Sequence, residues 1–257
     1  SLDLAEKLVE ILPIKDPHVM FGSSGSEAID FLIKLLRFGA VARGEPTRKT
    51  IIGRHGSYHG ATLASASVTG GHHEEFGLPL PGFEHVAQVD YHGDREPGET
   101  TAEYSTRRAE ELEALISGQP MGSIAAMIAE PVSFSAGFKL PPPEYFPAIA
   151  SVLAAHGIEL VIDEVITGFG RTGNLFGSET FGLNPAHVAI AKGITSGYFP
   201  LSAIGLGRDL YDALEAGSDK IGTLAHASTF AAHPVGAAAA LKVMEIIERD
   251  KLVEHAS

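Results

Sequence analysis

Three short apolar runs without polar alternation constrain the fold of this chain more than any other feature. They cover residues 123–131, 157–165 and 187–193, and segments of helical character at 101–117 and 143–156 precede the first two. A strand with two apolar faces is typical of a mostly parallel sheet that helices cover on both sides. The sequence therefore predicts an α/β fold.

The remaining elements follow from the same periodicities. We expect further strands at 50–53 and 199–206, and amphipathic helices at 28–43 and 234–254. Glycine, proline and histidine recur throughout residues 70–98, which predicts a loop there.

Two of the apolar runs end in side chains that could do chemistry. Asp163 closes one run, and Lys192 closes the next, 29 positions later. In open α/β sheets the ligand crevice lies outside the carboxyl ends of the strands, so the two can share a pocket. Pyridoxal phosphate needs such a pair. A neutral lysine amine forms a Schiff base with its aldehyde, and a carboxylate keeps its pyridine nitrogen protonated.

A lysine at a strand end, taken alone, is more often a surface residue whose stem covers apolar neighbours. The glycine that follows, Gly193, lets the backbone turn sharply and permits a close approach to the amine. The pairing with Asp163 is what favours the functional interpretation of Lys192.

The segment Ser24-Gly25-Ser26-Glu27 has the composition of a phosphate-binding helix start. Ser24 and Glu27 have capping-box spacing, and the glycine and serines place backbone N–H groups and hydroxyls at a positive helix terminus. A plain helix cap explains the same residues equally well.

Two further residues have both a functional and a structural interpretation. Tyr58 lies in a glycine-flanked turn and could cover the face of a flat cofactor, or it could be a structural tyrosine. Thr229 lies in a polar turn before the last helix. It could contact a phosphate, or it could simply belong to the segment that leads into that helix.

Two motif-like stretches are rejected. His72-His73-Glu74-Glu75 invites a metal site, but adjacent residues point in different directions and no second ligand cluster has usable spacing, so we expect no metal. Gly168 to Gly173 matches the dinucleotide fingerprint, but no helix start follows it and no acid lies about 20 residues on.

Composition limits the classes of partner. The chain has 257 residues, and 19 Lys and Arg against 32 Asp and Glu give a net charge of −13, which argues against nucleic acid or anionic membranes. It has no cysteine, so disulfides and thiolate metal sites are impossible. Residues 1–10 show helical amphipathicity rather than a signal peptide, and no run approaches membrane-spanning length. We expect a cytoplasmic protein.

Both ends of the chain look like helix interiors, which suggests part of a larger polypeptide. A compact natural chain remains the alternative.

Taken together, the motifs resemble those of the class III pyridoxal-phosphate aminotransferases in order and spacing across nearly the whole chain. The matching segments are 24–28 (SGSEA), 56–62 (GSYHGAT), 129–131 (AEP), 163–165 (DEV), 168–173 (GFGRTG) and 191–193 (AKG).

The resemblance implies a fold and a set of roles. The fold is the fold-type I large domain over residues 1–257, a mainly parallel seven-stranded sheet between helices, in a homodimer with shared active sites. Lys192 would be the Schiff-base lysine and proton carrier, and Asp163 would hold the pyridine nitrogen. The remaining implied cofactor contacts are Val165 and Tyr58 on opposite ring faces, Ser24, Gly25 and Ser26 at the phosphate, Thr229 from the neighbouring subunit, and Glu130 near the active site.

The resemblance implies transamination from an amine or ω-amino acid to a 2-oxo acid. The segment 195–201 is similar to the branch that uses pyruvate as acceptor. Two departures stand out. Ser228 replaces a usual aromatic residue, and the family's N-terminal segment and C-terminal small domain, with its carboxylate-binding arginine, are not in this sequence. A lyase or racemase on the same fold, or a truncated non-catalytic cofactor-binding domain, are the alternatives.

Overall fold

The computed structural model describes residues 1–71 and 74–257. Its strands are β1 (His18–Gly22), β2 (Thr50–Arg54), β3 (Phe83–Val86), β4 (Ile124–Ala129), β5 (Glu159–Asp163), β6 (His187–Ile190) and β7 (Ser202–Leu206). Its helices are α1 (Leu2–Ile11), α2 (Gly25–Ala42), α3 (Leu63–Thr69), α4 (Tyr91–Asp94), α5 (Thr101–Ser117), α6 (Tyr145–Ala155), α7 (Gly177–Thr180), α8 (Arg208–Ile221), α9 (Pro234–Arg249) and α10 (Leu252–Ala256), with 3-10 turns η1 (Glu74–Phe76) and η2 (Lys192–Ile194).

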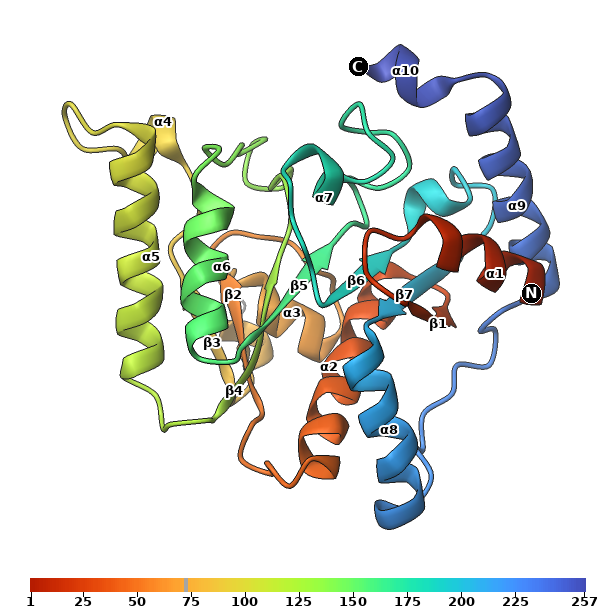
Figure 1. The fold of residues 1–257 in the computed structure, drawn as a ribbon, viewed down its shortest axis with the longest axis horizontal. Helices are drawn as coiled ribbons and strands as arrows, with labels where there is room; N and C mark the ends of the chain where they lie inside the picture. The colour runs from red at the N-terminus through yellow and green to blue at the C-terminus, as the bar shows by residue number, and fades with distance from the viewer. Residues whose placement is uncertain (72–73) are drawn as a thin grey trace.

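These strands form one seven-stranded sheet in the order β1-β7-β6-β5-β4-β2-β3 (Figure 1). The pairings from β6 through β5, β4 and β2 to β3 are parallel, whereas β7 is antiparallel to both of its neighbours. The mainly parallel sheet predicted from the sequence is therefore confirmed, with β7 as the strand that runs against the rest.

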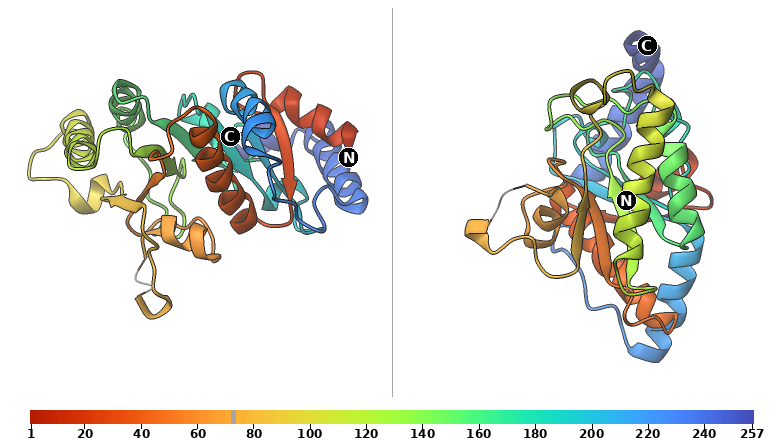
Figure 2. Two further views of the ribbon diagram at one scale, coloured as in Figure 1. Left: turned by 90° about the horizontal axis from the view of Figure 1, so that it is seen from below. Right: turned by 90° about the vertical axis from the view of Figure 1, so that its left-hand side faces the viewer.

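Helices cover both faces of the sheet, and each face has its own apolar core. Side chains of β5 show the division, because Val161 packs with α2, α3 and α8 while its neighbours Leu160 and Ile162 pack with α1, α5, α6 and α9. Figure 2 shows α5 and α6 on one side of the sheet and α3 on the other. Burial on both faces explains why these strands show no polar alternation.

Two predictions about the elements are wrong. Residues 70–98 are not all loop, because β3 adds an edge strand parallel to β2 there. The predicted helix 234–254 is interrupted, because α9 ends at Arg249 and Lys251 takes a positive φ of 50° before α10 begins. Left-handed backbone at a residue with a side chain ends a helical run.

None of the helices in the described part of the chain combines the length and the apolar character that crossing a bilayer requires.

Candidate functional site

A pocket at the carboxyl ends of the parallel strands contains both residues that the sequence pairs. β5 ends at Asp163, and β6 ends at Ile190, two positions before Lys192. The register of the two strands sets Asp163 beside Ala189, so both strands end at the same edge of the sheet. Asp163 and Lys192 both line the pocket, as do five other predicted residues: Gly25, Ser26, Tyr58, Glu130 and Val165.

Asp163 is fixed in this pocket by two donors. Its Oδ2 lies 2.8 Å from Nδ1 of His59, and its Oδ1 accepts the backbone N–H of Val165 at 3.0 Å. The side chains of His59 and Asp163 are 0% and 5% exposed, so little water competes for these contacts. Because a carboxylate only accepts, the proton of the imidazole lies on Nδ1. The carboxylate is thus held in one orientation.

Lys192 begins η2 with a positive φ of 44°, which a residue with a side chain rarely adopts. Strain of this kind, of order 1–3 kcal/mol, is found mainly at functional sites. The side chain is exposed to the open pocket. Even so, its partial burial lowers the pKa of the amine, which Asp163 and Glu130 raise and Arg171 lowers further.

The backbone turns at Gly193, within η2, but the left-handed residue of this turn is Lys192. Gly193 is needed for close packing instead. A Cβ at Gly193 would lie 3.0 Å from Cβ of Phe169 and 3.2 Å from the carbonyl oxygen of Gly168.

Val165 packs directly against the first turn of α2. A Cβ placed on Gly25 would lie 3.1 and 3.2 Å from the two methyl carbons of Val165, so only glycine fits there with ordinary contacts. Tyr58 is 44% exposed and lines the same pocket from the turn after β2. The pocket is therefore bounded by an aromatic ring from one element and a branched side chain from another.

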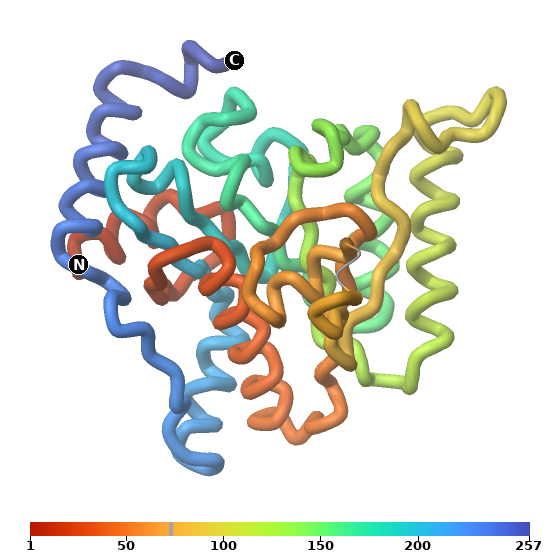
Figure 3. Tube along the Cα trace, turned by 180° about the vertical axis from the view of Figure 1, so that it is seen from behind, coloured from red at the N-terminus to blue at the C-terminus, as the bar shows by residue number. Residues whose placement is uncertain are grey.

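The start of α2 has the cap that the sequence predicts. The Oγ of Ser24 accepts the N–H of Glu27, and the N–H of Ala61 donates to Oγ of Ser26 at 3.1 Å. The turn after β2 lies beside this helix start (Figure 3). It can approach because Gly60 has a φ of 138° and no Cβ to meet Oγ of Ser26. The first N–H groups of a helix have no carbonyl partner within it, which suits an anion.

Glu130 lies in the wall of the pocket, just after β4, and is 4% exposed. Its Oε2 accepts the hydroxyl of Ser133 at 2.6 Å and lies 3.7 Å from Nη2 of Arg54. Burial raises the pKa of the carboxyl, against the opposing effects of His59, Arg54 and Ser133.

Thr229 lies outside the pocket, in the exposed segment between α8 and α9. This segment passes along the outside of the molecule (Figure 3). A role for Thr229 at the phosphate therefore depends on a partner subunit, as the resemblance implies.

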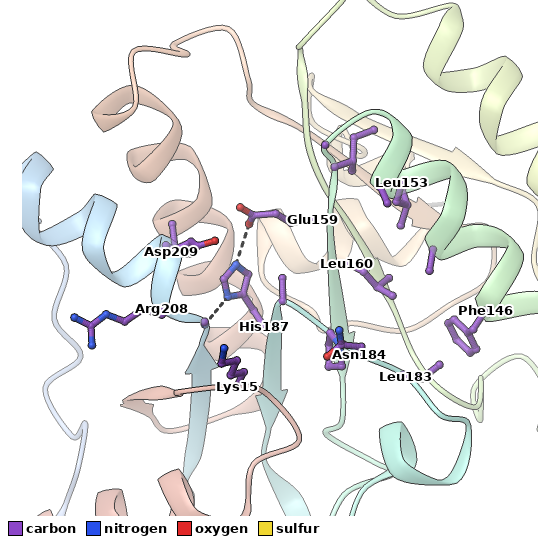
Figure 4. Close-up of a pocket in the computed structure, with 18 of the residues that line it drawn as sticks. Lys15, Phe146, Leu153, Glu159, Leu160, Leu183, Asn184, His187, Arg208 and Asp209 are labelled. Carbon is purple, nitrogen blue, oxygen red and sulfur yellow. Dashed lines mark hydrogen bonds and ion pairs between the residues drawn. The ribbon is translucent and has the colours of Figure 1, made fainter.

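A second hollow, of about 910 Å³, opens at the opposite edge of the sheet (Figure 4). The polar side chains of His187 and Glu159 in this hollow already have partners within the protein. Nε2 of His187 lies 2.9 Å from Oε2 of Glu159, and Nδ1 of His187 accepts the N–H of Gly207. The same Glu159 pairs with Arg43 at 3.1 Å. The smaller pocket is the better candidate because its polar groups converge at the carboxyl edge.

Residues 1–71 and 74–257 contain no cluster of three or more His, Cys, Asp or Glu placed to hold a metal ion. Of the rejected metal motif, His72 and His73 lie outside the described residues. The dinucleotide-like segment from Gly168 to Gly173 leads only to the four-residue α7, which begins at Gly177.

The family model "Aminotransferase class-III" matches residues 1–257. The chain belongs to this family. Among class III relatives it is 43% identical to an uncharacterised aminotransferase of Sinorhizobium fredii over 98% of this chain and 55% of that protein. It is 40% identical to gamma aminobutyrate transaminase 3 of Solanum lycopersicum over 99% of this chain and 50% of the relative. The chain thus spans about half the length of these curated relatives.

Solved structures of class III enzymes have the same fold. An omega transaminase from Pseudomonas jessenii in complex with PMP superposes with a TM-score of 0.97 at 40% identity, over 99% of this chain and 57% of that one. A transaminase solved with L-alanine gives a TM-score of 0.96 at 43% identity, over 98% of this chain and 60% of that one.

Class III aminotransferases use pyridoxal 5′-phosphate, and the residues of this pocket fit it. The glycine cradle at Gly25 leaves room beside Val165, and Asp163 is a buried carboxylate that only accepts hydrogen bonds. Lys192 brings a primary amine to the same space. A planar pyridine aldehyde requires a hydrogen-bond acceptor for its ring nitrogen, an amine for its aldehyde and side chains that cover its two faces. Asp163, Lys192 and the pair of Tyr58 and Val165 provide these groups.

Among the residues without a functional prediction, His59 lines this pocket and Arg54 contacts Glu130 from outside the lining. His59 lies inside a matching motif, directly after Tyr58, and its position in a tight turn was the available signal. Arg54 gave no signal, because nothing in the sequence relates it to Glu130, 76 positions away.

Proposed function

We propose that residues 1–257 form the pyridoxal-phosphate-binding large domain of an aminotransferase that moves an amino group from an amine or ω-amino acid to a 2-oxo acid. The observation that carries this proposal is the convergence of Lys192 and Asp163 in one pocket from neighbouring parallel strands. Membership of class III supports the reaction class, and relatives are named for gamma aminobutyrate and vanillin.

When bound, pyridoxal phosphate supplies an aldehyde that condenses with amines and a ring that withdraws electrons from the adjacent carbon. Lys192 would hold the cofactor through its amine. Once released, that amine would take the proton from the Cα of the substrate and act as the proton carrier of the site. The lowered pKa of Lys192 favours this role, because a base must be unprotonated to accept a proton.

Asp163 would accept the N–H of the pyridine ring and keep that proton in place. His59 supports this role by holding the carboxylate from behind at 2.8 Å. Tyr58 and Val165 would cover the two faces of the ring and exclude water from it. Ser24, Gly25 and Ser26 would bind the phosphate at the start of α2, and Glu130 would lie beside the reacting groups.

Thr229 would reach the phosphate of a partner subunit in a homodimer with shared active sites. Its exposure and its position outside the pocket of its own chain are consistent with this role. The segment from Thr195 to Leu201 supports an omega transaminase with pyruvate as acceptor, as do structural neighbours of that name. A cytoplasmic location stays a prediction, since some relatives are chloroplastic or mitochondrial.

Incubation of the cofactor-loaded protein with an amine donor and no 2-oxo acid tests the reaction class. A transaminase stops after one product molecule per site, whereas a lyase or racemase continues to turn over. Lys192→Ala should abolish product formation in the complete reaction. Transamination by Lys192→Ala at the wild-type rate would contradict the proposal, and a protein that binds no cofactor would favour a non-catalytic chain.

A further inference from the structure

Arg54 is a fully buried charge that the proposed reaction does not use. It ends β2, its side chain is 0% exposed, and it does not line the pocket. Nη2 donates to the backbone oxygen of Glu130 at 2.7 Å, while Nε and Nη1 have no hydrogen-bond partner among the described residues. A buried guanidinium destabilises the folded protein unless an anion compensates its charge. The carboxylate beside it, 3.7 Å away, is that of Glu130.

Glu130 is held from a second side by neutral groups. The hydroxyl of Ser133 donates to Oε2 at 2.6 Å, and Nε2 of Gln88 in turn donates to Oγ of Ser133 at 3.1 Å. A hydroxyl that accepts from an amide has its own proton free to donate, so this chain of contacts favours an ionised carboxylate.

The charged and titratable groups around Glu130 come from four elements. Arg54 comes from β2, His59 from the turn after it, Asp163 from β5 and Lys192 from η2. Arg54 is the one among them that lies outside the pocket lining. It therefore acts on the site through Glu130.

We propose that Arg54 is a positioning residue of this pocket, which holds the carboxylate of Glu130 ionised and fixed in the wall beside Lys192. Glu130 then has one cation behind the pocket, Arg54, and another within it, Lys192. The inference needs only the pocket, but its consequence for catalysis rests on the proposed function.

The direction of the effect follows from the neighbours. Burial raises the pKa of Glu130, and Arg54 is one of the groups that oppose this rise. Without the guanidinium the pKa of Glu130 should rise further, so the carboxyl takes up a proton over more of the neutral range. The negative charge of Glu130 also raises the pKa of Lys192. When Glu130 takes up a proton in the same variant, the amine should therefore lose its proton at lower pH.

The test is a carbon-13 NMR titration of the Glu130 carboxyl in the cofactor-free protein, with Glu130→Gln to assign the signal. We expect Arg54→Met to raise the midpoint by about one pH unit or more, because a neighbouring charge shifts a carboxyl by 1–3 units. Arg54→Lys, which restores the charge, should return the midpoint toward the wild type. A purely structural arginine would lower the melting temperature and leave the midpoint unchanged, and that result would overturn the proposal.

Arg54→Gln provides a second neutral variant if Arg54→Met does not fold, because its amide can still donate to the carbonyl of Glu130. The pH profile of kcat/KM supplies an independent readout. It should shift in Arg54→Gln, and the shift should vanish when Glu130→Gln is added. A wild-type protein that binds no pyridoxal phosphate would contradict the proposed function alone, because the NMR midpoints are measured without cofactor.

Discussion

His59 and Asp163 form a buried pair across 104 positions of sequence, with Nδ1 and Oδ2 2.8 Å apart. The backbone N–H of His59 in turn donates to Oγ1 of Thr69 at 3.0 Å, which anchors the turn that carries the imidazole. The carboxylate is thus oriented before any ligand arrives. Such preorganisation spares a binding site the cost of ordering its side chains.

Replacing His59 by phenylalanine should weaken cofactor binding. The ring volume is kept, but one hydrogen bond to a charged group is lost, worth about 1.5–3 kcal/mol, or roughly ten- to a hundredfold in affinity. Absorbance titration with pyridoxal phosphate measures the dissociation constant. The exposed His55 offers the matched control, since His55→Phe should leave the constant unchanged. Equal affinity in His59→Phe and wild type would show that the pair does not support Asp163.

The reactivity of Lys192 should respond in opposite directions to two neighbours. Arg171 lowers the pKa of Lys192 and Asp163 raises it. Arg171→Gln should therefore raise the pKa and reduce the unprotonated fraction at neutral pH, while Asp163→Asn should do the reverse. Acetylation of the cofactor-free protein across pH, followed by mass spectrometry, measures both. Lys15, at the opposite edge of the sheet, serves as the internal control. Shifts of the same sign in the two variants would rule out this electrostatic account.

Gly25→Ala should push Val165 out of place. The new Cβ would lie 3.1–3.2 Å from the Val165 methyl carbons, closer than the 3.5–4.0 Å or so of an ordinary carbon contact. We expect a loss of about tenfold in cofactor affinity, or roughly 1.4 kcal/mol. Val165→Ala in the same protein should restore part of it by removing those methyl groups. A double variant no better than Gly25→Ala would mean that the clash is not the cause.

Thr229 should link cofactor binding to dimerisation. If its hydroxyl reaches the partner's phosphate, whatever raises the one affinity must raise the other. Sedimentation with and without pyridoxal phosphate should show a tighter dimer with cofactor. Thr229→Ala should lose roughly ten- to a hundredfold in cofactor affinity, from about 1.5–3 kcal/mol. A dimer constant indifferent to cofactor, with normal binding by the variant, would leave Thr229 as a turn residue.

The elements that the sequence predicts best are those with a local physical signal. Helix α5 has the bounds 101–117 that its amphipathic pattern predicts, and in the structure Thr100 and Glu103 form a capping box at its start. Strands β4, β5 and β6 can be predicted from the sequence because burial on both faces leaves continuous apolar runs.

The misses have equally local causes. Strand β3 has only four residues, and Glu84 and His85 interrupt its apolar ends within a Gly- and Pro-rich stretch. Its pairing with β2 is a tertiary contact that no local pattern reveals. The same holds in the pocket. Asp163 and Lys192 follow from strand ends, but the link from Arg54 to Glu130 depends on the order of β2 and β4 in the sheet.

The most direct test of the central claim is to trap the cofactor on its lysine. Borohydride reduction of the protein loaded with pyridoxal phosphate should fix one cofactor per chain, and peptide mapping should place it on Lys192. Asp163→Asn should still be labelled there, because its change affects the ring nitrogen rather than the amine. Label on another lysine, or equal label in Lys192→Ala, would contradict the account.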